Sequence, residues 1–381
     1  MQRSSGVQVG FTCQWDRVDR RRTWSHTPYH LLTALQHEGG IVDVPMELPR
    51  APELLIKLWY ARLHATGLLS VASWTPAMYR LRHAALRRAV DLAPQCDAIL
   101  TIGEHGPIDR PQFVYQDQSV GQFIEYFEQH GVMADVRDVP SMRLLRKRTA
   151  IERETYRTLA GVFTMSAWNA RHLIASGCID AAHVHVVGAG INVASELPTE
   201  DDVARRLAKT QRTVLFIGRH FERKGGDVVV AGVQHARQMS GTDIQLVVAG
   251  PTAWPLPGEP PSWVRFIGDA PLERVQSELR QADALALPSR FEAYGIAVLE
   301  ALAAGVPVIG RNDFAMPEMI DGGLTGALVD GNTAEEFAEA VLNVLGNETI
   351  AWETLRRAPE VRAQHAWSAV ARNMLEIIGK S

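Results

Sequence analysis

Cysteine, lysine and long apolar runs are all scarce in this 381-residue chain. The three cysteines, Cys13, Cys96 and Cys178, are odd in number and show neither metal-binding nor CxxC spacing, so we expect no disulfide framework and no zinc site. No apolar run is long enough to span a bilayer. The N-terminus lacks an apolar signal core, and we therefore expect a cytoplasmic protein.

A strong excess of either charge is also lacking. The formal net charge is −4, which argues against a dedicated nucleic-acid binder. Only five of the 39 basic residues are Lys, so a Lys in a glycine-rich loop draws attention. The chain exceeds the length at which single cores stop growing, and we expect two domains of ordinary size.

Alternation of apolar runs with helical patterns dominates the second half. This alternation is typical of a parallel sheet covered by helices on both faces, and the first half repeats it less regularly. The expected fold class is α/β, with two doubly wound, Rossmann-like domains facing across a cleft. In the first half, long helices are predicted at 53–65, 78–92 and 144–159. In the second half, strands are predicted at 213–217, 244–249, 264–267, 284–287, 306–309 and 327–329.

The weakest pattern lies at residues 191–211, which include a run of acidic residues, and we interpret this segment as a linker. We therefore expect an N-terminal domain over 1–190 and a C-terminal domain over 191–365. A helical pattern at 366–381 remains after the second sheet is complete. We predict that it packs back on the first domain.

A loop rich in glycine and cations follows the first strand of the second domain. The strand ends at Gly218 and continues into RHFERKGGD, which supplies Arg219 and Lys224 before a helix begins. Backbone N–H groups at a helix N-terminus, with a guanidinium and an ammonium, suit an anion such as a diphosphate. The loop is neither a Walker A sequence nor a GxGxxG fingerprint, so a dinucleotide cofactor is disfavoured. A solvated basic loop is the alternative.

Two carboxylates lie in the run RFEAYGIAVLEALAAGVPVIG, residues 290–310. We expect Glu292 in the loop after a strand, and Glu300 more than one turn into the following helix. A carboxylate in so apolar a segment needs a partner. A buried ion pair is one alternative, and the vicinal hydroxyls of a sugar are the other. Next to a diphosphate site, sugar hydroxyls indicate a nucleotide sugar.

The succession GRHFERKGG, LPSRFEAYGIAVLEALAAGVPVIG and MPEMIDGGLTGALVD resembles the donor half of the retaining glycosyltransferases of family 4, which have the GT-B fold. The resemblance is specific over residues 213–345 and looser before them. It implies that Arg219 and Lys224 hold the diphosphate. It also implies that Glu292 contacts the transferred sugar and Glu300 the ribose. Further donor contacts implied by the resemblance are Gly218, Tyr294, Gly295 and Ile296 for phosphate and sugar, and Ile267 and Gly268 for the base.

The resemblance implies an activity as well. We expect transfer of a sugar, with retention of configuration, from a UDP- or GDP-sugar to a saccharide, lipid-linked or small-molecule hydroxyl, without metal or cofactor. UDP is favoured on family frequency, and glycan, glycolipid or glycoconjugate biosynthesis is the expected setting. The first domain would bind the acceptor and the second the donor. The chain departs from the family at Phe314–Ala315–Met316, where members often have a glycine pair, and at His26, where a small residue is expected.

Candidates for the acceptor side are fewer. His105 and Asp117 each follow a predicted strand, and either can accept or orient the acceptor hydroxyl, with Asp117 favoured. A local turn role is the alternative for both. His26, in an arginine-rich loop, can bind an anionic acceptor or be solvated. A basic helix can touch an anionic membrane or be an exposed face; its cations are Arg143, Arg146, Lys147 and Arg148.

Three other functions remain open on a similar fold. A sugar-nucleotide epimerase and a phosphorylase are the enzyme alternatives, and a non-catalytic nucleotide-sugar binding protein is the third. Phosphate-dependent release of a sugar phosphate would indicate the phosphorylase. Binding without turnover would indicate the binding protein.

Overall fold

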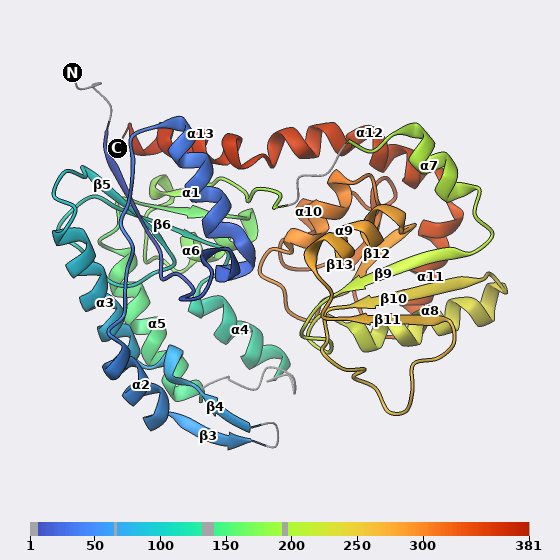
Figure 1. The fold of residues 1–381 in the computed structure, drawn as a ribbon, viewed down its shortest axis with the longest axis horizontal. Helices are drawn as coiled ribbons and strands as arrows, with labels where there is room; N and C mark the ends of the chain where they lie inside the picture. Colours follow the sequence, from blue (N-terminus) through green and yellow to red (C-terminus); the bar gives the residue numbers. More distant parts are fainter. Residues whose placement is uncertain (1–6, 65–66, 132–140, 193–196, 381) are drawn as a thin grey trace. The chain divides into compact units, whose positions relative to one another are not determined.

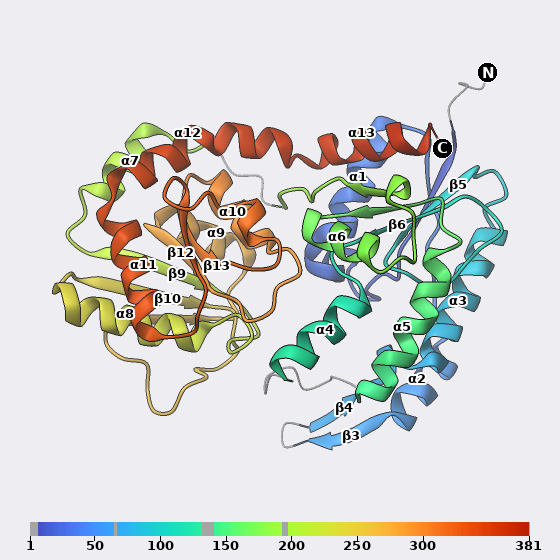
Figure 2. The same ribbon diagram turned by 180° about the vertical axis from the view of Figure 1, so that it is seen from behind.

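The computed structural model describes residues 7–64, 67–131, 141–192 and 197–380 (Figures 1 and 2). Contacts divide the chain into two compact units. The first unit takes its described residues from 7–192 and 366–380, and the second from 197–365. The boundary expected from the sequence, after residue 190, lies two residues before this division.

The first unit is built on a six-stranded parallel sheet in the order β2-β1-β5-β6-β7-β8. Its strands are β1 (Val9–Thr12), β2 (Ile41–Asp43), β5 (Ala98–Ile102), β6 (Gln112–Gln116), β7 (Gly161–Thr164) and β8 (Val184–Val186). The four strands β1, β5, β6 and β7 are buried along their whole length, because helices cover both faces of the sheet (Figure 1). The helices are α1 (Thr27–Glu38), α2 (Arg50–Trp59), α3 (Pro76–Asp91), α4 (Val120–His130), α5 (Met142–Tyr156), α6 (Ala167–Ala175) and α13 (Trp367–Ile378).

The second unit repeats the architecture with a parallel sheet in the order β11-β10-β9-β12-β13-β14. Its strands are β9 (Arg212–Ile217), β10 (Ile244–Ala249), β11 (Val264–Gly268), β12 (Ala284–Leu287), β13 (Val308–Arg311) and β14 (Gly326–Val329). Its helices are α7 (Glu200–Leu207), α8 (Gly226–Ser240), α9 (Leu272–Gln281), α10 (Ile296–Ala303), α11 (Ala334–Gly346) and α12 (Glu348–Gln364). One apolar cluster joins the central strands to α8, α10 and α11. All six predicted strands of this half are present, each within two residues of the predicted ends.

Each sheet contains one point where the strand order reverses. In the first unit β1 continues outward to β2 on one side, while β5 starts the other side. In the second unit β9 continues to β10 and β11, while β12 starts the opposite side. Loops that leave the carboxyl ends of such adjacent strands diverge, which opens a crevice where ligands of doubly wound sheets bind.

Two sequence predictions are wrong at the level of single elements. The helix predicted at 53–65 ends at Trp59, and the chain instead forms an antiparallel hairpin of β3 (Ala61–His64) and β4 (Gly67–Ser70). The predicted linker contains helix α7, whose start is fixed by a capping box: the Thr199 side chain accepts from the Asp202 N–H, and the Asp202 carboxylate accepts from the Thr199 N–H. The acidic residues read as a linker signal are therefore the first turn of a helix, where they suit the dipole.

The C-terminal helix α13 belongs to the first unit and packs against α1. Its buried face includes Trp367, and the indole N–H donates to the Asn192 side chain at 3.0 Å. A Cβ on Gly190 would collide with that indole ring, so the absence of a side chain there lets the helix dock. None of the helices in the described ranges combines the length and the apolar character that a membrane crossing requires.

Candidate functional site

The loop after β9 lies tightly against the loop after β12. Gly225 ends the first loop with φ +77°, a conformation that favours glycine, and a Cβ there would collide with the Pro288 carbonyl oxygen. Gly218 begins the loop, and a Cβ on it would lie 2.9 Å from the Lys224 side chain. The glycines of the motif therefore bring the two loops together at the strand-order reversal.

Lys224 and Glu292, one from each loop, form a buried ion pair. The Lys224 ammonium contacts a Glu292 carboxylate oxygen, and the two side chains are 17% and 12% exposed. The Ser289 hydroxyl is a further, longer partner at 3.5 Å. Burial acts to raise the pKa of Glu292, but the Lys224 and Arg223 charges outweigh it and hold the pKa below its usual value. Two of the residues predicted for donor binding, Lys224 and Glu292, are thus in direct contact.

The arrangement of these loops is held by arginines. The Arg290 guanidinium binds both carboxylate oxygens of Asp227 at 2.6 and 2.7 Å, which joins the β12 loop to the first turn of α8. The Arg290 N–H donates to the Arg223 carbonyl at 2.8 Å, and the Arg223 side chain donates to the Phe291 carbonyl at 2.7 Å. Hydrogen bonds of Arg290 and Arg223 therefore fix the two loops that carry Lys224 and Glu292 against each other.

Arg311, at the end of β13, is a functional neighbour that the sequence analysis missed. Its buried guanidinium donates to the carbonyls of Pro288 at 2.9 Å and Ser289 at 3.2 Å. It also donates to the Asp330 carbonyl at 3.0 Å, the Gly331 carbonyl and the Asn332 side chain. One side chain thus connects the loops after β12 and β14. The only sequence signal is an Arg that directly follows an apolar strand.

The other predicted donor residues lie at the same edge of the second sheet but are not all in contact. Arg219 is exposed and donates to Asp269 at 3.3 Å, directly after Ile267 and Gly268, the last two residues of β11. The Gly268 carbonyl accepts from the Gly250 N–H at 2.7 Å. The helix α10 begins here: Tyr294 is buried, Gly295 is its N-cap with φ +93°, Ile296 is its first residue, and Glu300 is half-buried in its second turn.

Phe314 explains how the chain departs from the expected glycine pair. Its φ is +60°, so a non-glycine residue occupies the left-handed region in which glycine is favoured. The ring is buried and packs edge-on against Phe291, with centroids 5.5 Å apart. Burial of an aromatic ring is worth about 3–5 kcal/mol and exceeds the strain of roughly 1–2 kcal/mol. The loop conformation thus survives without the glycine.

A pocket of about 350 Å³ lies at the carboxyl ends of β1, β5 and β6 in the first unit. Two of the three acceptor-side candidates, His105 and Asp117, line it. His26 is not among its lining residues, although Thr23 and Trp24 from the same loop are. Instead, His26 is the N-cap of α1 with φ +70°, and its ring lies 6.4 Å from that of His30.

Polar side chains line this pocket, and some of their hydrogen-bonding atoms have no partner among the described residues. Arg148 forms a buried ion pair with Glu104, whose other carboxylate oxygen accepts from the Tyr79 hydroxyl at 3.0 Å. The Arg148 Nη1, the Gln116 amide nitrogen and the Gln118 amide oxygen are buried without a hydrogen-bond partner among the described residues. Unpaired buried donors and acceptors are costly, so these groups suit a ligand with hydroxyl groups.

Two ionisable groups of the pocket have unusual pKa values. Burial raises the pKa of Glu152 to about 7, although both carboxylate oxygens accept from the Val120 N–H at 3.1 Å. Burial, with the Arg82 and Arg148 charges, lowers the pKa of His105 to about 3. A ring nitrogen of His105 also lies 3.0 Å from the Ile102 carbonyl. His105 is thus neutral at pH 7 and better suited to orient a hydroxyl than to remove its proton.

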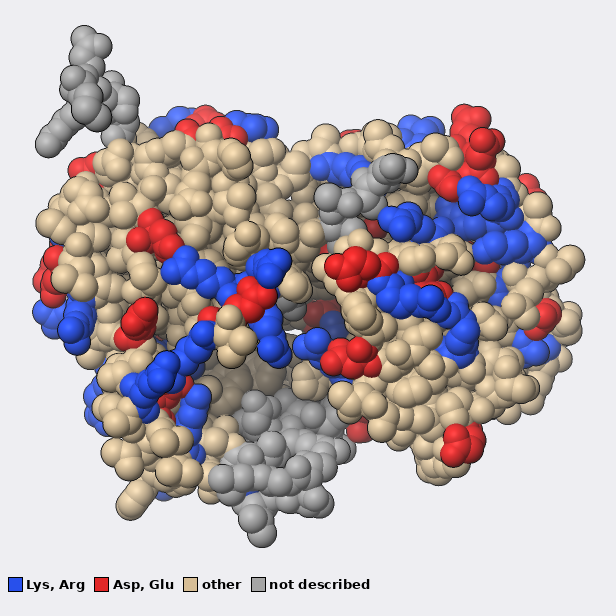
Figure 3. Space-filling model, in the orientation of Figure 1, with Lys and Arg blue, Asp and Glu red and all other residues tan. Residues whose placement is uncertain are grey.

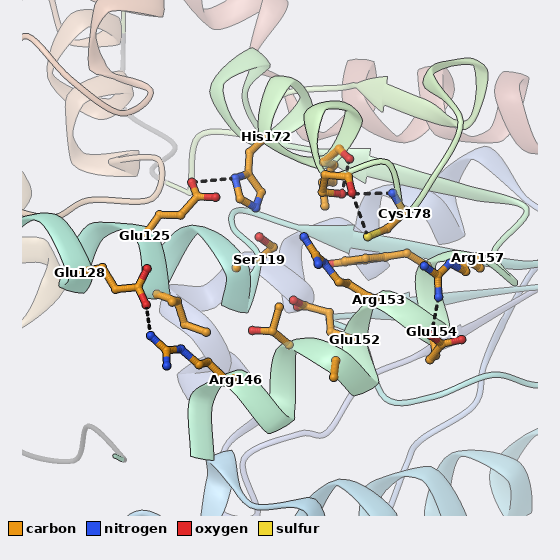
Figure 4. Close-up of a pocket in the computed structure, with 17 residues that line it drawn as sticks. Ser119, Glu125, Glu128, Arg146, Glu152, Arg153, Glu154, Arg157, His172 and Cys178 are labelled. Carbon is orange, nitrogen blue, oxygen red and sulfur yellow. Dashed lines mark hydrogen bonds and ion pairs between the residues drawn. The ribbon is translucent and has the colours of Figure 1, made fainter. Parts of the chain in front are cut away.

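A second hollow, of about 550 Å³, lies between α4, α5 and α6 (Figure 4). His172 pairs with Glu125 at 3.2 Å, and Arg146 pairs with Glu128 at 2.6 Å (Figure 4). None of the predicted catalytic, donor or acceptor residues lines it. Two cations of the predicted basic helix are also accounted for here, because Arg146 is ion-paired and Arg148 is buried. Arg143, Arg146 and Lys147 remain exposed, so three of the four predicted cations face solvent.

The second unit matches the model of a known family. Residues 199–364 match the family model "Glycosyl transferases group 1". The D-inositol 3-phosphate glycosyltransferase of Mycolicibacterium smegmatis is 28% identical over 214 residues, which cover 52% of this chain and 48% of that protein. The protein of that name from Jonesia denitrificans is 30% identical over 219 residues, covering 52% and 51%. The chain thus spans about half the length of the curated relatives it matches.

Solved structures match the whole chain. Sucrose-phosphate synthase from Thermosynechococcus elongatus has a TM-score of 0.68 at 17% identity and covers 98% of both chains. WaaG, a glycosyltransferase involved in lipopolysaccharide biosynthesis, has a TM-score of 0.64 at 14% identity, covering 98% of this chain and all of that one. HepE of Anabaena, solved with UDP-glucose, has a TM-score of 0.62 at 13% identity with the same coverage. These likenesses confirm the predicted GT-B fold class.

Proposed function

Since residues 199–364 belong to the glycosyl transferases group 1 family, we propose that this protein transfers a sugar from a nucleoside diphosphate sugar to a hydroxyl acceptor, with retention of configuration. The observation that carries the proposal is the buried Lys224–Glu292 pair between the loops after β9 and β12. A cation for phosphate and a carboxylate for sugar hydroxyls meet at the strand-order reversal where doubly wound sheets bind ligands.

In the proposed mechanism, the second unit assists departure of the nucleoside diphosphate. Lys224, Arg219 and the N-terminus of α8 stabilise the charge that develops on the phosphate oxygens as the sugar–phosphate bond breaks. The chain's own cations supply this charge, so the proposal needs no metal ion. Glu292 accepts hydrogen bonds from the sugar hydroxyls, and Glu300 accepts them from the ribose. The departing phosphate oxygen takes the proton of the acceptor hydroxyl as that hydroxyl attacks on the same face.

On the acceptor side, we propose that the pocket of the first unit holds a hydroxylated acceptor. The unpaired groups of Arg148, Gln116 and Gln118 support this assignment, and His105 and Asp117 line the same pocket. The relatives from M. smegmatis and J. denitrificans are named for D-inositol 3-phosphate, so polyol phosphates belong in the acceptor panel. HepE was solved with UDP-glucose, so UDP-glucose belongs in the donor panel.

The first experiment incubates the protein with UDP- and GDP-sugars, with and without acceptors, and follows release of the nucleoside diphosphate. We expect slow hydrolysis of one donor and faster release with an acceptor. Release of a sugar phosphate that depends on phosphate and on no nucleotide would identify a phosphorylase instead. Conversion of the donor to its epimer would identify an epimerase, and binding without turnover a non-catalytic protein.

Substitution of the buried pair tests the site itself. Lys224→Met and Glu292→Gln should each lower transfer by at least about 100-fold. Each should also lower stability by about 3–5 kcal/mol, because the remaining charge is buried without its partner. The double variant Lys224→Met/Glu292→Gln should recover much of that stability but no activity. The measurements are initial rates and urea unfolding.

The matched control is Arg265→Met, which breaks an ion pair in the same unit between strand β11 and Glu278 of helix α9. It should retain transfer. Wild-type turnover in Lys224→Met or Glu292→Gln would refute the assignment of the pair to catalysis.

A further inference from the structure

Helix α2 of the first unit exposes its apolar side chains to solvent, unlike an ordinary surface helix. Of its residues, all of them described, only Glu53 is buried. Four large apolar side chains are exposed instead: Leu54 at 57%, Leu55 at 68%, Leu58 at 55% and Trp59 at 84%. At 100° per residue, these four positions lie within one continuous arc of the helix surface. An exposed apolar cluster of this kind marks an interaction surface.

The helix is fixed in this orientation by its polar contacts. The buried Glu53 carboxylate contacts the Arg17 guanidinium and accepts from the Lys57 ammonium at 2.7 Å. Arg17 also donates to the Leu48 carbonyl at 3.0 Å, just before the helix. At the other end, the Ser70 hydroxyl donates to the Lys57 carbonyl at 2.8 Å, which ties the hairpin to the helix. The apolar arc is therefore displayed on a rigid element.

The sequence stretch that contains this arc has an excess of cations, in a chain whose net charge is −4. Between Leu48 and Val90 the sequence contains seven basic residues and one acidic residue, the buried Glu53, and the exposed Glu47 and Asp91 flank this stretch. The exposed cations of this stretch are Arg50, Lys57, Arg62, Arg80, Arg87 and Arg88. In the lower left of the molecule, where α2, α3 and the hairpin lie, Lys and Arg side chains border an uncharged surface (Figures 1 and 3).

We propose that the exposed face of α2 docks on an anionic lipid membrane. The leucines and Trp59 enter the boundary between headgroups and acyl chains, where an aromatic ring and aliphatic side chains are stabilised together. Lys57 and the exposed arginines nearest in the sequence, Arg50 and Arg62, reach the lipid phosphates, with their aliphatic stems along the apolar surface. The basic part of α5 also exposes cations, but no large apolar side chain is exposed among the described residues of that helix, so it offers no comparable apolar face.

Charge also decides between a membrane and a second copy of the chain. In a two-fold symmetric dimer, the same patch would face itself across the axis. Two surfaces with an excess of cations would then repel each other. An anionic bilayer, by contrast, attracts each Lys or Arg near its surface.

The test is co-sedimentation of the full chain with phosphatidylcholine vesicles, with and without phosphatidylglycerol. We expect binding to the anionic vesicles to exceed binding to the neutral ones by roughly tenfold at an ionic strength of about 0.1 M, and to fall in higher salt. Leu55→Ser/Trp59→Ala should lose most of the binding, and Arg50→Glu/Arg62→Glu should lose the preference for anionic lipid. Circular dichroism should show unchanged folding, since all four side chains are exposed.

The matched control is Met239→Ser/Trp352→Ala, which removes two exposed apolar side chains of the second unit, 54% and 37% exposed. It should bind as the wild type does. Equal recovery of the wild type with neutral and anionic vesicles, or unchanged binding of Leu55→Ser/Trp59→Ala, would overturn the proposal. So would a dimer that forms without vesicles, is lost in that variant and is accompanied by no vesicle binding. None of these readouts depends on glycosyl transfer.

Discussion

The buried carboxyl group of Glu152, in the pocket of the first unit, makes the stability of the fold depend on pH. It is 4% exposed, and its carboxylate accepts from the Val120 N–H at the start of α4. Burial nonetheless dominates and raises its pKa from 4.5 to about 7. Between these two pH values the folded chain keeps a proton that the unfolded chain has released. The stability contributed by this proton is full below pH 4.5 and is lost as the pH rises through 7.

Glu152→Gln should therefore abolish the fall in unfolding free energy that this carboxyl group causes as the pH rises. We expect the unfolding free energy of the wild type, relative to the variant, to fall by roughly 3 kcal/mol as the pH rises from 4.5 to above 7, since one pKa unit corresponds to about 1.4 kcal/mol. Urea unfolding across this range measures it. Glu154→Gln, on the same helix at a side chain that is 74% exposed, is the control. Parallel curves for Glu152→Gln and wild type would contradict the assignment of the shift to this carboxyl group.

At the scale of elements, the donor-side loops owe their arrangement to the strand ends that they follow. β9 and β12 are adjacent in the sheet although Lys224 and Glu292 are 68 residues apart. Arg311 at the end of β13 then fixes the loop after β12 through the Pro288 and Ser289 carbonyls. This guanidinium holds the backbone beside Glu292 without belonging to the ion pair. We therefore regard Arg311 as a positioning residue.

Arg311→Lys should separate positioning from charge. A lysine keeps the positive charge but cannot reach all five acceptors, so buried carbonyls lose their partners and stability falls by roughly 3 kcal/mol or more. We expect KM for the donor to rise more than kcat falls. Thermal unfolding and initial rates measure the two effects, with the exposed Arg280→Lys as the control. An unchanged KM together with lowered stability would limit Arg311 to a structural role.

At the scale of the whole molecule, the chain returns to its first unit at its end. α13 follows the last helix of the second unit and completes the core of the first, where Trp367, Val370 and Met374 are buried. The integrity of the first unit therefore depends on residues that follow the whole second unit in the sequence. A chain that stops before α13 would leave the α1 face uncovered.

Met374→Ala should accordingly weaken the first unit and spare the second. Met374 is fully buried, and truncation of such a side chain costs about 2–5 kcal/mol. We expect faster hydrogen exchange in β1 and β5 and unchanged exchange in β9 and β12. Mass spectrometry of peptides from each strand measures this, with the exposed Met239→Ala as the control. Equal acceleration in both sheets would show that the two units unfold together.

Sequence alone determined most of the second unit and its candidate donor site. Buried parallel strands read as short apolar runs, and their predicted ends lie within two residues of the observed ones. The glycines and cations after β9 and the carboxylate after β12 are signals that need no knowledge of distant neighbours, because the carboxyl ends of parallel strands share one edge. Gly218, Lys224 and Glu292 could therefore be assigned to one site before their contacts were known.

In the first unit, only the tertiary structure decided which charged side chains are buried and which helix faces are exposed. Arg148 reads as one cation of an exposed helix, but the fold places it on Glu104 in the floor of a pocket. The helix predicted from Glu53 gives no sign of which face is buried, but Arg17, 36 residues earlier, pairs with the buried Glu53, and the leucines of α2 are exposed. Local patterns define which residues share a helix face. Only the distant partners of that helix decide whether the face meets the core or the solvent, because a buried charge is stable only where its partner lies.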